Sequence, residues 1–130
     1  MNEHTKNVVV RGGIPSQGGA PIPSQALHDI RGDYVEVKWL PVIGPTATLL
    51  ARRLVGLLDG TDPIDVSTLA HGLGVGRSRF WQALDRLQRF GLAGVNVLPD
   101  HDLTIIYLLR RWPDAPQYQR QRDRNKEAAS

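Results

Sequence analysis

Residues 66–93 constrain the fold of this chain more than any other part of the sequence. They read VSTLAHGLGVGRSRFWQALDRLQRFGLA, a pattern that predicts a short helix, a turn and a longer helix. Ser67 is the expected N-cap of the first helix, which should end at His71 or Gly72, because a serine hydroxyl accepts hydrogen bonds from a helix's first turn. Gly74 permits the tight turn, since glycine has no Cβ to clash.

The second helix is expected over residues 77–90 and is amphipathic at about 100° per residue. Its inner stripe consists of Phe80, Ala83, Leu84 and Leu87. Ser78, Gln82 and Arg89 fall opposite that stripe, with Arg79 and Arg86 on one flank and Trp81 and Asp85 on the other. Gly91 should end the helix, because glycine readily adopts the left-handed cap conformation.

The segments before this pair predict one helix and two extended pieces. Gly44, Pro45 and Thr46 open a helix that continues to about Asp59, since proline is tolerated in a first turn. Residues 34–40 alternate between polar and apolar side chains, which predicts a half-buried strand or an extended arm. Residues 64–66 are expected to form a short strand. In the helix expected over residues 44–59, the inner stripe comprises Leu50, Leu54, Leu57 and Leu58, and Ala47 and Ala51 allow tight contacts.

A β-hairpin is expected after the second helix. Residues 92–98 and 103–109 are rich in β-forming side chains, and residues 99–102 supply the reversal between them. Three helices followed by a two-stranded hairpin form a winged-helix arrangement. The expected fold class is therefore mainly α with a small β-hairpin (α+β), over residues 33–112.

Both ends of the chain are expected to lie outside that domain. Residues 1–32 are rich in Gly, Pro, Ser and Gln, so they predict a disordered arm that buries little apolar surface. Residues 113–130 form a basic, polar tail with almost no apolar face, either frayed or held as a helix by a partner.

Composition narrows the classes of protein to consider. A length of 130 residues supports one domain, and the absence of cysteine excludes disulfides and thiolate metal sites. No apolar run is long enough to cross a membrane, and residues 1–10 lack a secretory pattern. We expect a cytoplasmic protein without a membrane partner.

The positive charge is concentrated in two stretches. Residues 72–94 carry four arginines and one aspartate, residues 110–126 carry six basic and two acidic residues, and the remainder sums to −4 within a total of +3. Thirteen of the sixteen basic residues are arginine, which suits phosphate and guanine contacts and equally suits a GC-rich genome. A segregated basic surface favours nucleic-acid binding, with a solvated helix face and a charged tail as the alternative.

Residues 63–109 resemble the winged helix-turn-helix DNA-binding domains of bacterial transcriptional regulators, MarR-like in the broad sense and reminiscent of actinobacterial and phage regulators. The resemblance implies sequence-specific binding of double-stranded DNA by a nucleoid-associated homodimer, with helix 77–90 in the major groove. It places base reading on Arg77, Ser78, Arg79, Trp81 and Gln82. It places phosphate contacts on Arg86 and Arg89, and the basic stretch that follows the hairpin adds Arg110 and Arg111.

Two features depart from that family and support an alternative. Asp100 and Asp102 occupy the hairpin turn, where carboxylates repel phosphate. Trp81 can meet a thymine methyl or sugar, pack on the first helix or cover a dimer surface, with packing the favoured option. The alternative is a winged-helix module for protein interaction, such as a replication or partition accessory. Candidate dimer surfaces are residues 34–40, the helix expected over residues 44–59 and the tail.

An enzyme is the least favoured class. The four histidines are scattered, and only His101 has neighbouring carboxylates, in a turn that predicts no metal site. The sequence has neither a phosphate-binding loop with its lysine nor a nucleophile elbow. We expect no cofactor and no small-molecule effector.

Overall fold

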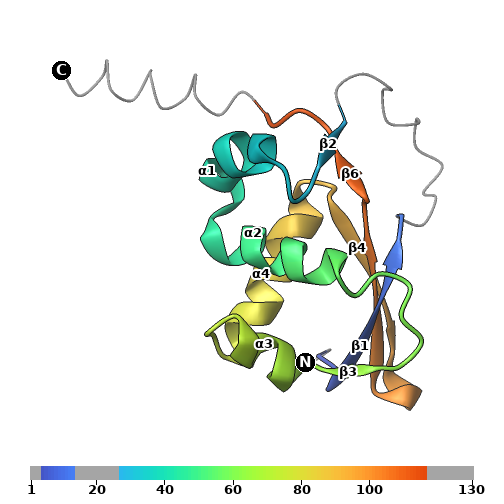
Figure 1. Ribbon diagram of the computed structural model, residues 1–130. Helices are drawn as coiled ribbons and strands as arrows, with labels where there is room; N and C mark the ends of the chain where they lie inside the picture. Colours follow the sequence, from blue (N-terminus) through green and yellow to red (C-terminus); the bar gives the residue numbers. More distant parts are fainter. Residues whose placement is uncertain (1–3, 14–26, 117–130) are drawn as a thin grey trace.

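The computed structural model describes residues 4–13 and 27–116. Within these ranges the chain has an α+β fold, in which helices cover one face of a small sheet (Figure 1). The expected disorder of residues 14–26 and the expected tail from residue 117 lie outside the described residues. None of the described helices has the length and apolar character needed to cross a bilayer.

The main sheet has four strands in the order β3-β1-β5-β4, which is larger than the expected hairpin. β1 (Asn7–Gly12) lies inside it, antiparallel to β3 (Ile64–Asp65) and parallel to β5 (Leu103–Leu108). β4 (Ala93–Leu98) pairs with β5 from Ala93↔Leu108 to Leu98↔Leu103 and forms the far edge. The expected hairpin and short strand are confirmed.

β1 shows that the expectation of a disordered arm over residues 1–32 was wrong for this stretch. Val8, Val9 and Val10 are all buried, so successive side chains, which point to opposite faces of the strand, are shielded from solvent. The backbone is tied in as well, since Asp59 N–H donates to Val10 O at 2.7 Å and Val66 N–H donates to Lys6 O at 2.8 Å. The three valines form a true strand signal that the surrounding Gly- and Pro-rich composition obscured.

Three of the described helices confirm the expected ones. α2 (Pro45–Val55) begins with proline in its first turn, and α3 (Val66–Gly72) and α4 (Arg77–Arg89) follow. α2 ends four residues before Asp59, yet Leu57 and Leu58 beyond it remain partly buried against the core. The largest fully buried side chains join helices and sheets in one core: Trp39, Trp112, Phe80, Ile30, Ile43, Leu50, Leu54, Leu84, Leu87, Leu92, Ile106 and Leu108.

The predicted strand at residues 34–40 was wrong, because this segment is helical. A π-helical turn, η1 (Val35–Trp39), runs directly into α1 (Leu40–Ile43). Val35 and Trp39, four residues apart, are buried, whereas Val37 between them is exposed. Burial of side chains with helical spacing in the core therefore overrides the β-propensity of the valines.

The chain after the hairpin does not leave the domain at residue 113. β6 (Arg111–Trp112) pairs with β2 (His28–Asp29) in a second, two-stranded sheet. Pro113 O accepts a hydrogen bond from Trp39 Nε1, and Ala115 N–H donates to the Tyr34 hydroxyl, both at 2.9 Å. The start of the expected tail is thus packed on η1.

Candidate nucleic-acid interface

Local hydrogen bonds define the start of α3 and the turn between α3 and α4. Asp65, not the predicted Ser67, caps α3, since its carboxylate accepts from Ser67 N–H at 2.8 Å. Gly74 adopts a φ of +75° in the turn, and Val75 N–H donates to Ala70 O at 3.0 Å. The predicted glycine turn is confirmed, and the N-cap lies two residues earlier because aspartate accepts the bond there.

The two faces of α4 are divided as the sequence predicts. Phe80, Ala83, Leu84 and Leu87 are buried in the core, and Gly91 follows the helix with a φ of +72°. The solvent side carries Arg77, Ser78, Arg79, Gln82, Asp85, Arg86 and Arg89, all exposed. The packing of the apolar stripe thus leaves the arginine-rich side of α4 outermost.

The first turn of α4 is arranged to attract anions. Its N-cap, Gly76, supplies no side-chain hydrogen bond, and the turn contains no acidic residue. Arg77 and Arg79 are exposed there. Because the free N–H groups of a helix start carry partial positive charge, a negative group beside these arginines would be favoured.

The predicted phosphate-contacting arginines fall into two groups. Arg86 lies on α4 and its Nη1 donates to Ile43 O at 3.4 Å, while Arg89 pairs with Asp85 at 3.2 Å on the exposed surface. An exposed pair of this kind is weak and leaves Arg89 available to other anions. Arg111 is exposed in β6, on a different element from α4.

Arg110 is occupied within the fold. Its Nη2 donates to Asp59 Oδ2, and its guanidinium lies against Gly12 at the end of β1. The hydrogen bond from Arg110, helped by the N–H of Gly12, lowers the pKa of the Asp59 carboxyl. Arg110 therefore connects β1 to the segment after α2, through a contact between distant parts of the chain that no local pattern reveals.

Trp81 is not free on the outer face of α4. Its ring is half-buried and stacks on His4, with centroids 4.5 Å apart and planes 8° apart. Packing was the favoured expectation for Trp81, but its stacking partner is the start of the chain and not the first helix. A base could stack on this face of the indole only after His4 had moved.

The acidic hairpin turn contacts the same N-terminal segment. Asp102 has a φ of +49°, and its Oδ1 accepts a hydrogen bond from Lys6 N–H at 2.9 Å. Asp100 is exposed and adds negative charge at the turn. Asp102 thus has a structural partner in the chain itself. Across the described ranges, no group of three or more His, Asp or Glu side chains is placed to hold a metal ion.

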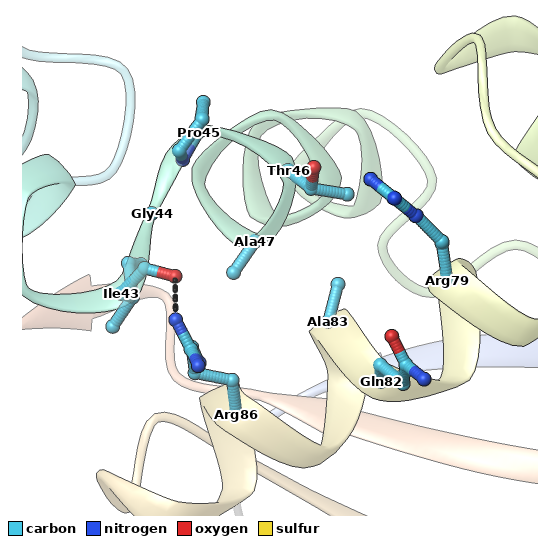
Figure 2. A pocket seen from close by; sticks show the side chains of 9 residues that line it. All are labelled: Ile43, Gly44, Pro45, Thr46, Ala47, Arg79, Gln82, Ala83 and Arg86. Carbon is cyan, nitrogen blue, oxygen red and sulfur yellow. Dashed lines mark hydrogen bonds between the residues drawn. The ribbon is translucent and has the colours of Figure 1, made fainter.

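Sequence reasoning missed a hollow of about 270 Å³ between α4 and the start of α2 (Figure 2). It is lined by Ile43, Gly44, Pro45, Thr46, Ala47, Arg79, Gln82, Ala83 and Arg86. The four residues from α4 have the 3-1-3 spacing of one helical stripe, which was visible in the sequence. Which element faces that stripe depends on tertiary packing, so the partner could not be read from the sequence.

No protein-family model matches this sequence, and no curated protein or solved structure shows significant similarity to it.

Proposed function

We propose that this protein binds double-stranded DNA through α4, as a winged-helix domain. The observation that carries the proposal is the exposed side of α4, on which four arginines and a glutamine face solvent. An α-helix fits the major groove, where guanine presents two acceptors to arginine and adenine presents a donor and an acceptor to glutamine.

Separate roles follow for the exposed residues of α4. Arg77, Ser78 and Gln82 lie on its first turns and are the candidates for base edges. Arg86 and Arg89 lie nearer its C-terminus, where phosphate contacts supply affinity without sequence information. The hairpin turn has Asp100 exposed, so in this proposal it stays outside the minor groove.

We further propose that the DNA-binding form is a homodimer, because one reading helix rarely gives useful specificity. Val37 on η1 and Leu49 on α2 are the most exposed large apolar side chains among the described residues. Both lie in segments expected to form a dimer surface. Sedimentation velocity should show a dimer at micromolar concentration, and Val37→Ser with Leu49→Ser should lower its fraction.

A mobility-shift assay with duplexes selected from random DNA tests the DNA proposal. Arg77→Ala should raise the Kd for the preferred duplex by about 10- to 100-fold and relax its sequence preference, since one bidentate guanine contact contributes about 1–3 kcal/mol. Arg31→Ala removes an exposed arginine from the turn between β2 and η1, outside the proposed DNA and dimer surfaces, and should leave the Kd unchanged. Equal Kd values for both variants would remove Arg77 from the interface.

The acidic turn and the exposed Val37 and Leu49 favour one second candidate, a module that binds protein and not DNA. That candidate predicts no shift of any selected duplex, even at low salt, while the apolar surface still mediates association. The DNA-binding and protein-binding candidates therefore predict opposite results in the mobility-shift assay.

A further inference from the structure

We infer that the hollow between the start of α2 and α4 binds a single phosphate group. Its outer wall carries two guanidinium groups, from Arg79 and Arg86, together with the Gln82 amide and the Thr46 hydroxyl. Its floor contains Ala47 and Ala83, whose small side chains leave the space open. Several hydrogen-bond donors thus line a hollow that no protein group fills.

The two guanidinium groups approach the hollow from its two sides. Figure 2 shows Arg79 extending from α4 toward Thr46, and Arg86 extending toward Ile43 on the other side of Ala83. Arg86 Nη1 lies over Gly44, where an added Cβ would stand 3.6 Å from it. Each of these groups is suited to a phosphate, because a guanidinium binds phosphate oxygens through parallel N–H bonds.

The charge of the hollow is uncompensated within the described part of the chain. None of its lining residues is acidic, and neither Arg79 nor Arg86 forms an ion pair there. Asp85, the one carboxylate on α4, is paired with Arg89 instead. An anion would therefore displace no ion pair, although Arg86 Nη1 already donates a hydrogen bond to Ile43 O at 3.4 Å.

The first N–H groups of α2 belong to residues that line the hollow. The bond from Thr48 N–H to Gly44 O, at 3.1 Å, is the first of the helical series, so the N–H groups of Thr46 and Ala47 precede it. These two N–H groups are additional donors beside the guanidinium groups of Arg79 and Arg86. The ligand class is a phosphate monoester or diester, small enough to leave its remainder in solvent.

Two sources can supply this phosphate group. One is the backbone of a bound duplex, which rests on the proposed function and moves Arg79 and Gln82 from base reading to phosphate binding. The start of α2 would then lie against one strand while α4 enters the groove. The other is a free phosphate ester in solution, which requires no DNA.

Thr46→Asp tests the site without weakening the fold. The new carboxylate would lie among the guanidiniums and exclude phosphate, while a negative charge in the first turn favours α2. The unfolding temperature should therefore equal or exceed that of the unaltered protein. Thr61→Asp introduces the same charge in an exposed turn outside the hollow and is the matched control.

Titration of the full chain with inorganic phosphate, followed by NMR, decides whether the site exists. We expect saturable shifts of the Thr46 and Ala47 amide signals in the unaltered protein and in Thr61→Asp, and none at Ala47 in Thr46→Asp. The absence of saturable shifts in the unaltered protein, or their persistence in Thr46→Asp, would overturn the inference.

Duplex binding by the same variants then identifies the source. A Kd raised about tenfold or more in Thr46→Asp alone assigns the site to the DNA backbone, as expected for a lost charge-assisted contact. Phosphate titration that succeeds while no variant binds duplex supports a free phosphate ester and contradicts the proposed function. Failure of the site and failure of the DNA proposal are therefore distinguishable.

Discussion

Among single residues, Asp59 connects parts of the chain that are far apart in sequence. Its carboxylate accepts from Arg110 and from Gly12 N–H, and its own N–H donates to Val10 O. It holds this position with a φ of +61°, a conformation that aspartate and asparagine tolerate better than most residues. The side chain thus joins the end of α2 to β1 and to the segment after β5.

The Asp59 contacts make stability depend on pH in the acid range. Because Arg110 lowers the pKa of the folded-state carboxyl, its contribution is complete above the unfolded pKa, about 3.9, and is lost as the pH falls through the lower folded value. Asp59→Asn should reduce the free energy of unfolding at pH 7, and its deficit should shrink between about pH 4 and pH 2. Denaturant titrations at several pH values measure this.

Asp62→Asn is the control for that prediction, because Asp62 is exposed in the neighbouring turn. It should leave the free energy of unfolding nearly unchanged at pH 7. A deficit in Asp59→Asn that stays constant down to pH 2 would reject the assigned role of the carboxylate.

Replacing each of two glycines near α4 by alanine should change the stability of the fold in opposite directions. Gly74 has a φ of +75° with open space around it, so Gly74→Ala should cost about 1–2 kcal/mol from backbone strain alone. Gly72 is the last residue of α3, also in open space but without a positive φ, so Gly72→Ala should stabilise by up to about 1 kcal/mol. Thermal unfolding of the two variants should shift in opposite directions. A shift of the same sign in both would show that the turn tolerates other conformations.

At the scale of elements, β1 is the strand on which the sheet depends. It separates β3 from β5 and forms six residue pairs with β5 in parallel register. Val8→Ala should therefore destabilise by about 2 kcal/mol or more, through lost burial and a cavity. Val37→Ala, at a position 63% exposed, should change stability by less than about 0.5 kcal/mol. If urea unfolding showed equal midpoints for both, β1 would not belong to the core.

The predictable elements are those whose pattern is local. α4 has a clear apolar stripe ending at Gly91, and the hairpin has two β-rich segments around a turn, so both could be read from the sequence. β1 pairs with a strand almost one hundred residues later, and η1 is helical because its buried side chains fit the core. Neither the long-range pairing of β1 nor the burial that makes η1 helical can be seen in a short stretch of sequence.

The same distinction holds for the candidate site. The exposure of Arg77, Ser78, Arg79 and Gln82 follows from the helical period and was predictable. The stack of Trp81 on His4 and the approach of α4 to Gly44 depend on where distant segments come to lie. Long-range packing thus determines which segments contact Trp81 and the stripe of α4 that lines the hollow.

On the scale of the whole molecule, the core fixes α4 with its apolar side inward and its basic side outward. The N-terminal segment holds the hairpin turn through Asp102 and covers Trp81 through His4. The exposed side of α4 is a basic surface next to a hollow that two arginines line. This arrangement is the basis of the proposed DNA binding.

The most direct test is the salt dependence of duplex binding by the full chain, measured by fluorescence anisotropy with a labelled random-sequence duplex. If α4 and the hollow hold backbone phosphates, log Kobs should fall linearly with log[salt] with a slope of about −2 to −4, as expected for two to four phosphate contacts. No binding at low salt, or binding that does not change with salt, would contradict duplex binding through α4 and the hollow.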